Sequence, residues 1–257
     1  MLKRNSEEIE WHNALVEPPI KKEDIDNLVK RTVSDIQATL KDNKVAVAYS
    51  GGKDANALLE VMKMTGKDFK VFNVLTNVEY PQMLEWLKEK DIPNYHEVVI
   101  PIDWSWVREN PKMLFPKESN TASKWFQIVQ HKGQKKLAQE HDIDILVLGR
   151  RKSDGNYVGR GSNVYQKKTE TFSRYSPLSD WSHDELISFL SHYNIDLPPI
   201  YNYPKGFRNG THPIPARPNV DSDKEALEEL ETIDKGIIET MADNGIDIAK
   251  EYLNGEI

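Results

Sequence analysis

The chain contains no cysteine among its 257 residues. This absence excludes disulfides, thiolate zinc sites, cysteine-held iron–sulfur clusters and a cysteine nucleophile. Long apolar runs are missing as well, because no stretch approaches the roughly 18 apolar residues that a membrane-spanning helix needs. The first residues, "MLKRNSEEIEWHN", also lack the apolar core of a signal peptide. We therefore expect a cytoplasmic protein with no membrane contact.

Acidic residues outnumber basic ones, and the net charge of −7 is unevenly spread. Residues 221–257 hold 12 acidic and 3 basic residues, whereas residues 150–174 hold 7 basic and 2 acidic residues. We expect the acidic tail to be a packing or oligomer element, so that the protein is a homo-oligomer or a complex subunit. The basic segment is expected to be a solvated loop or a flexible substrate loop. Nucleic-acid contact stays open but is not favoured, because an acidic protein is a poor general polyanion binder.

Short β-branched runs alternate with segments of helical periodicity. The expected strands are 44–49, 69–76, 95–101 and 142–150, and the expected helices are 25–40, 55–64, 81–90 and 121–141. This alternation predicts an α/β, Rossmann-like parallel sheet with helices on both faces, together with an N-terminal helix and a C-terminal helical tail. We expect three parts: a helical extension over 1–43, a nucleotide-binding domain over 44–220 and an acidic helical tail over 221–257.

Two further segments carry local signals. Residues 103–120 form a long aromatic connection, for which a surface loop with packing tryptophans and a substrate lid are equally good interpretations. Ser182, followed three residues later by Glu185, predicts a capping box at the start of a helix.

The stretch "SGGKD", residues 50–54, lies between the first expected strand and the next helix. Gly51 and Gly52 allow a tight turn and a close approach of the backbone to a bound group, and the helix start offers unpaired N–H groups to an anion. Ser50 can donate another hydrogen bond, and Lys53 supplies a positive charge for a phosphate chain. Asp54 would repel phosphate unless a cation lies between them, which makes it a candidate Mg²⁺ ligand. A plain glycine turn is the alternative, and neither the Walker loop nor the dinucleotide fingerprint is present.

Four later segments accompany this loop: "LTNVEYPQMLEWL", "ILVLGRRKSDG", "YSPLSDWSHDELISFL" and "YNYPKGFRNGT". Together with the loop they resemble the PP-loop ATP pyrophosphatases, and within them the phosphoadenylyl-sulfate (PAPS) reductase branch, which includes FAD synthetase-like domains. The matches run from about residue 45 to residue 211. The resemblance implies an adenine nucleotide alpha hydrolase-like fold, with ATP or a related adenylyl nucleotide across the carboxyl ends of the strands.

The resemblance also implies roles for individual residues. Ser50, Gly51, Gly52, Lys53 and Asp54 would hold the phosphates, with Mg²⁺ on Asp54.

At the end of the fourth strand, Gly149 and Arg150 would contribute to nucleotide binding. Arg150 and Arg151 would reach the phosphate or sulfate end, since guanidinium groups bind such oxygens bidentately. By resemblance alone, Glu79 and Asp180 are candidates for a second acidic group.

The chain departs from the family pattern at three places. Ala55 stands where the loop usually has a hydroxyl, and Trp125 and Phe126 fall where some relatives carry a cysteine pair for an iron–sulfur cluster. The reductases attack sulfur with a cysteine near the segment "NGTHPIPAR", where Thr211 is a far weaker nucleophile at neutral pH. His212, in the same segment, is a candidate site residue because this tail should close over the site. Cysteine-dependent sulfonucleotide reduction and an iron–sulfur cluster are therefore not expected.

Chemistry that needs no protein nucleophile remains. We expect an enzyme that binds ATP or a related adenylyl nucleotide with Mg²⁺ and transfers AMP to a small-molecule or nucleotide acceptor, releasing pyrophosphate. Two alternatives stay open. One is a nucleotide- or sulfonucleotide-binding subunit that has lost catalysis, and the other is the adenylylating subunit of a nucleic-acid thiolation system with a partner sulfur donor.

Overall fold

The computed structural model describes residues 6–161, 163–217 and 220–257. Its centre is a six-stranded sheet in the order β3-β2-β1-β4-β6-β5. The strands are β1 Val45–Ala48, β2 Lys70–Thr76, β3 Tyr95–Ile100, β4 Ile145–Val147, β5 Val164–Tyr165 and β6 Ser173–Tyr175. All neighbours pair in parallel except β5, which pairs antiparallel with β6. The predicted α/β fold with a parallel sheet is confirmed, and the four predicted strands all form.

Strands β5 and β6 lie in the basic segment 150–174, where the sequence predicted a loop. They are two and three residues long, too short for a period-2 pattern to stand out. At the other edge, β3 alternates exposed and buried residues towards its end, because an edge strand is covered less completely than the central β1. The expectation of uniformly buried strands is therefore wrong for β3.

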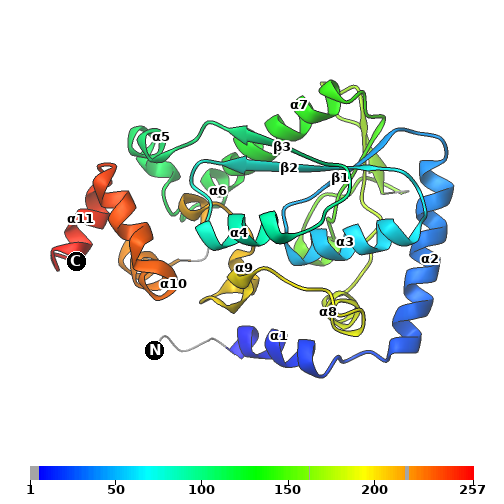
Figure 1. The fold of residues 1–257 in the computed structure, drawn as a ribbon, viewed down its shortest axis with the longest axis horizontal. Coiled ribbons are helices and arrows are strands. Elements are labelled where there is room, and N and C mark those ends of the chain that lie inside the picture. Colours follow the sequence, from blue (N-terminus) through cyan, green and yellow to red (C-terminus); the bar gives the residue numbers. More distant parts are fainter. Residues whose placement is uncertain (1–5, 162, 218–219) are drawn as a thin grey trace.

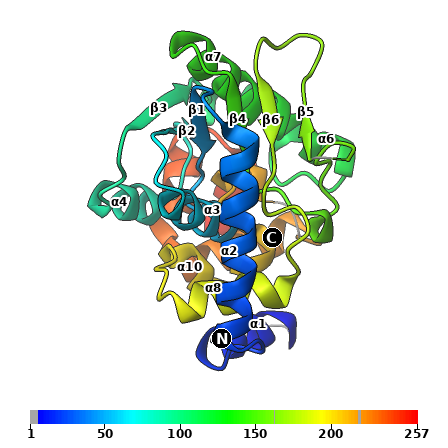
Figure 2. The same ribbon diagram turned by 90° about the vertical axis from the view of Figure 1, so that its right-hand side faces the viewer.

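Helices cover both faces of the sheet. Figure 1 shows α7, Lys132–Glu140, on one side, and α3, Lys53–Met64, with α4, Pro81–Glu89, on the other. Helix α2, Lys22–Leu40, contacts α3 and α8, His183–His192, and Figure 2 shows it running in front of α3.

Helix α1, Ser6–Val16, contacts α8 and the short α9, Gly206–Asn209, and thus forms an outer layer. The remaining α-helices are α5 Trp104–Glu109, α6 Ser119–Trp125, α10 Asp223–Asp243 and α11 Asp247–Leu253. Helices α10 and α11 pack on each other, as expected for a helical tail, with a break of helical geometry at Asp234.

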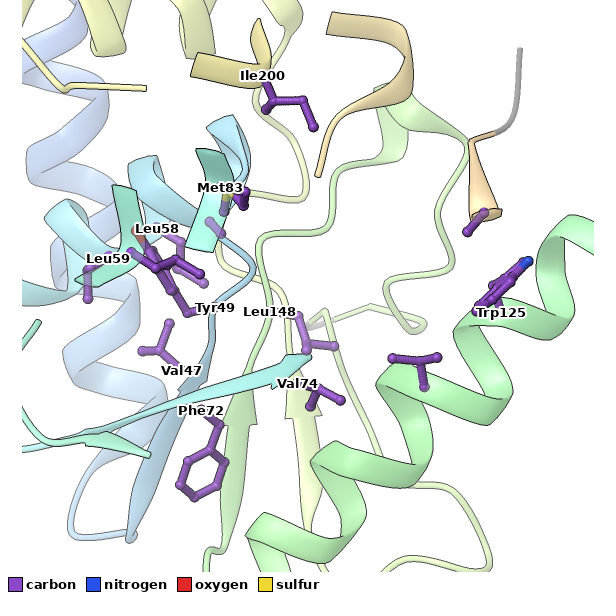
Figure 3. Close-up of a cluster of buried hydrophobic side chains, with 14 of the residues drawn as sticks. Val47, Tyr49, Leu58, Leu59, Phe72, Val74, Met83, Trp125, Leu148 and Ile200 are labelled. Carbon is purple, nitrogen blue, oxygen red and sulfur yellow. The ribbon is translucent and has the colours of Figure 1, made fainter. Parts of the chain in front are cut away.

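One contiguous hydrophobic core joins these layers. Figure 3 shows Val47 and Phe72 of the sheet, Leu58 of α3 on one side and Trp125 on the other. The predicted helix 121–141 is correct in position but interrupted, because residues Phe126–His131 form a π-helical stretch between α6 and α7. Trp125, Val129 and Leu137 are buried as predicted, whereas Ile128 is only partly buried.

Residues 103–120 pack against the rest of the fold. Trp104 and Val107 of α5 are buried, and Trp125 donates its indole N–H to the Met113 carbonyl at 3.1 Å. This favours the packing interpretation over a lid. The predicted capping box is confirmed, since Ser182 and Glu185 exchange hydrogen bonds of 2.7 and 3.1 Å. In the described part of the chain no helix is long and apolar enough to cross a membrane.

Candidate functional site

The loop after β1 requires both of its glycines. Gly51 has a positive φ of 70°, and a Cβ there would lie 2.2 Å from the Met83 side chain on α4. Gly52 has ordinary backbone angles, but three hydroxyl groups surround the position that its Cβ would occupy. Those of Ser50, Tyr201 and Thr211 all lie 3.3 Å from that point. Hydroxyls from three separate segments therefore meet at the start of α3, and Thr211 confirms that its segment closes over the loop.

Lys53 and Asp54, the first residues of α3, belong to a compact ionic cluster with Arg151. The Lys53 ammonium bonds one carboxylate oxygen of Asp54 at 2.7 Å, and the Arg151 Nε donates to the other oxygen, also at 2.7 Å. Burial alone would raise the pKa of Asp54, but the two cations outweigh it and lower this pKa. Asp54 is therefore an ionised carboxylate with a cation on each oxygen.

The Arg151 side chain is fully buried and has further partners. It donates to Asp154 at 2.9 Å and to the Ser182 carbonyl at 3.0 Å, and it lies 3.3 Å from the His183 ring. These bonds fix the guanidinium beside Asp54. In this arrangement Arg151 positions the carboxylate, and its reach towards a phosphate stays a prediction.

Helix α1 covers the cluster from outside. The Lys53 ammonium lies 5.4 Å from the centre of the Trp11 ring, which is itself stacked on Phe207 at 5.1 Å. The Tyr201 hydroxyl accepts the backbone N–H of Lys53 at 2.7 Å. Sequence analysis missed Trp11 and Tyr201 as site residues, because neither carries a local signal of its distant partner.

Gly149 and Arg150 lie at the carboxyl end of β4. A Cβ on Gly149 would lie only 2.8 Å from the Asp54 carbonyl oxygen, so the absence of a side chain lets β4 approach the first turn of α3. Arg150 points away from Asp54, since consecutive residues in extended backbone project in opposite directions. Its guanidinium donates to the Tyr165 hydroxyl at 2.9 Å and lies 3.3 Å from His131.

The two acidic candidates are placed differently. Glu79 accepts the backbone N–H of Thr76 at 2.9 Å and its hydroxyl at 2.7 Å, just beyond β2. Burial raises the pKa of Glu79 to about 7. The Asp180 side chain is 69% exposed and pairs with Lys152, a hydrogen bond that lowers its pKa, so it is a surface residue.

His212 lies in the segment that closes over the loop. Burial lowers the pKa of this half-buried side chain to about 4, so the imidazole is neutral at pH 7. Its ring meets Phe126 edge-on, with 5.4 Å between ring centres. Two residues further on, Ile214 donates its N–H to the Val78 carbonyl at 3.0 Å, which fixes this segment beside Glu79.

Asp54 is the donor that fits Mg²⁺. Over residues 6–161, 163–217 and 220–257, no three His, Cys, Asp or Glu side chains are grouped as a protein-only metal site would need. Mg²⁺ commonly takes only one or two carboxylates and completes its shell with phosphate oxygens and water. Asp54 keeps unused lone pairs on both oxygens, so this donor set suits a cation held jointly with a nucleotide.

Residues 44–209, more than half of the chain, match the phosphoadenosine phosphosulfate reductase domain. The chain belongs to this family. No curated protein matches the chain. The matched residues include the loop, the β4 end and Tyr201, so the family domain contains most of the site described above.

Solved structures agree on the fold. The PAPS reductase of Candida auris, in a phosphate complex, is 16% identical with a TM-score of 0.52, covering 72% of this chain and 93% of that one. The U34-tRNA thiolase NcsA of Methanococcus maripaludis, with its [4Fe-4S] cluster, gives 13% identity and 0.48, covering 90% and 80%. An NH₃-dependent NAD synthetase of Campylobacter jejuni gives 15% and 0.49, covering 88% and 92%.

The positions at which some relatives carry a cysteine pair have other uses here. Trp125 is buried with its indole N–H on the Met113 carbonyl, and Phe126 is 44% exposed beside His212. Neither side chain offers a ligand for iron. Because the sequence has no cysteine, the residues do not fit an iron–sulfur cluster of the family type.

Proposed function

We propose that the protein is an ATP-dependent adenylyltransferase of the PP-loop type. An oxygen of the acceptor attacks the α-phosphorus of ATP, the bond to the β-phosphate oxygen breaks, and pyrophosphate leaves. The observation that carries the proposal is the meeting of three hydroxyls around Gly52, at the start of α3 and next to Lys53. Such a group of donors beside a helix N-terminus suits phosphate oxygens.

The chain's own residues supply positioning and charge. Lys53 would turn from Asp54 to the phosphates, while Arg151 keeps the carboxylate in place. Mg²⁺, bound by Asp54 and the nucleotide, would neutralise phosphate charge. Phosphoryl chemistry depends mainly on these two contributions, so the lack of a thiol at Thr211 is no obstacle. Glu79, with a pKa near neutrality, is suited to take the proton of the acceptor.

The setting is part of the proposal. The acceptor is a small molecule or nucleotide, and the reaction takes place in the cytoplasm. The protein works as a homo-oligomer or complex subunit, with the nucleotide site in the 44–220 domain between the 1–43 extension and the 221–257 tail.

Pyrophosphate release tests this function. Purified protein with ATP, Mg²⁺ and a pool of small acceptors should release pyrophosphate, and Lys53→Ala should lower the rate at least a hundredfold because the phosphate charge loses its partner. Lys63→Ala is the matched control: Lys63 lies on the same helix, is 40% exposed and pairs with Glu60. Release that is absent with every acceptor, or equal in the two variants, would contradict the proposal.

A second candidate is a nucleotide-binding subunit without catalysis. It is favoured by the two cations on Asp54, which satisfy this carboxylate without Mg²⁺, and by the missing hydroxyl at Ala55. The two candidates differ in one measurement. ATP binding that depends on Lys53 but is accompanied by no pyrophosphate release would establish the second.

A further inference from the structure

A second group of cations lies at the carboxyl end of β4, on the side opposite Asp54. It consists of Arg150, His131 and Lys167, named here the 131–150–167 cluster. Arg150 follows β4, His131 ends the π-helical stretch, and Lys167 follows β5. The His131 ring lies between the two cations: its Nε2 is 3.3 Å from the Arg150 guanidinium, and its Nδ1 is 3.3 Å from the Lys167 ammonium.

This arrangement leaves one cationic donor without an acceptor. A neutral imidazole has one acceptor nitrogen, and its other nitrogen carries a proton. Burial, reinforced by the neighbouring cations, lowers the pKa of His131 to about 4, so the ring is neutral at pH 7. Whichever tautomer is present, either Arg150 or Lys167 faces an N–H group.

The carboxylate nearby does not balance the charge. Glu170 accepts both Nε and Nη2 of Arg174 at 2.9 Å, and lies 3.9 Å from Lys167. Within the described residues, Arg150, Lys167 and Arg174 thus face a single carboxylate in this group. Burial lowers the pKa of both Arg150 and Lys167, which shows that retaining their charges is unfavourable without a further anion.

The excess of two positive charges indicates the class of ligand. A phosphate monoester carries about −1.5 to −2 charges at pH 7 and offers three acceptor oxygens, whereas a carboxylate carries one charge. Its oxygens match the fork of a guanidinium and the single charge of an ammonium. The cluster borders the loop, because Gly149 packs on α3 and Arg151 bonds Asp54, but Arg150 points to the opposite side.

We propose that the 131–150–167 cluster binds the phosphate monoester of the acceptor substrate. The inference rests on the proposed function, since it assigns the acceptor to a class, and it gives the basic segment 150–174 a role. The chain of Arg150 and Lys167 donors would hold the phosphate, while His131, neutral beforehand, would accept a proton more readily beside the bound dianion.

Inorganic phosphate is the probe for the test, because its binding requires no adenylyl transfer. We expect phosphate to shift the His131 imidazole C–H signals in NMR spectra and to raise the His131 pKa. Lys167→Gln should weaken phosphate binding at least tenfold, whereas Lys168→Gln, at the exposed neighbouring lysine, should leave it unchanged. Circular dichroism and thermal unfolding of both variants check that the fold is intact. No response of His131, or equal affinity in the two variants, would overturn the proposal.

The same titration with saturating ATP and Mg²⁺ distinguishes the acceptor's phosphate from those of the nucleotide. Phosphate that still binds supports an acceptor subsite, and phosphate that competes with ATP assigns the cluster to the nucleotide and overturns the inference. Phosphate binding without pyrophosphate release in any assay would refute the proposed function while leaving the anion site established. Pyrophosphate release without phosphate binding would do the reverse.

Discussion

At the scale of single residues, Gly149 fixes how closely β4 approaches the site. A methyl group at this position would lie 2.8 Å from the Asp54 carbonyl oxygen and 3.3 Å from the Ala55 nitrogen, and neither backbone atom can move independently. We expect Gly149→Ala to destabilise the protein by about 1–3 kcal/mol and to weaken ATP binding by displacing the first turn of α3. Urea unfolding and a nucleotide-binding titration measure both effects.

Gly236→Ala is the control for this change. The nearest neighbour of its Cβ is the flexible Asp234 side chain at 3.1 Å, so its effect should stay below about 1 kcal/mol. Equal stabilities of the two variants would show that the contact between β4 and α3 is not tight.

Glu79 predicts a pH dependence of stability. Burial raises its pKa from 4.5 to about 7, so between these values the unfolded chain has released a proton that the native protein retains. The free energy of unfolding should therefore fall as pH rises from 4.5 to 7, and no further above that range. Glu79→Gln should remove this contribution, making the variant the more stable protein at pH 8 relative to pH 4. Urea unfolding across this range measures the difference, and parallel pH profiles of the two proteins would contradict it.

At the scale of elements, helix α10 is attached to the site through a buried ion pair. Arg217 donates to Glu229 at 2.7 and 2.9 Å, to the Tyr80 hydroxyl at 3.1 Å and to the Pro204 carbonyl at 2.6 Å. Both side chains are almost fully buried. The network joins the tail to the segments before and after Tyr201, so the acidic tail supports the loop that closes over Gly52.

We expect Arg217→Met to cost about 3 kcal/mol, because it leaves Glu229 buried with Lys205 as its remaining cation. Hydrogen exchange should speed up in α10 and in residues 204–217 before it does in the sheet. Lys250→Met breaks an exposed pair of 3.4 Å and should cost below about 1 kcal/mol. A loss in Arg217→Met no larger than in Lys250→Met would refute this role of the network.

At the scale of the whole molecule, ATP binding should stabilise the folded protein by mass action. At a free ATP concentration of about 100 times Kd the gain is about 2.7 kcal/mol. Thermal unfolding with ATP and Mg²⁺ should show this gain in the natural protein, and Lys53→Ala should reduce it. Titrating Lys63→Ala in parallel controls for changes of surface charge. The same gain in all three proteins would place the nucleotide elsewhere.

The alternation of elements and the position of the loop could be predicted because they depend on signals a few residues long. The turn of Gly51 and Gly52, the helix that begins at Lys53 and the capping box of Ser182 all belong to this class. The pairing of Asp54 with Arg151 could not be predicted, since the two residues are 97 positions apart and only the parallel β1 and β4 bring them together.

By itself, then, the sequence determined the family and its fold, the phosphate-type loop, and the absence of thiol chemistry, because these follow from composition and from short motifs. The tertiary structure alone decided how the charges are used. It turned Arg151 towards Asp54 and Arg150 towards His131, placed Trp11 over Lys53, and brought Lys167 to the same histidine from a hairpin that no periodicity indicated. Extended backbone sends neighbouring arginines to opposite sides, and only the packed sheet determines which partners each of them meets there.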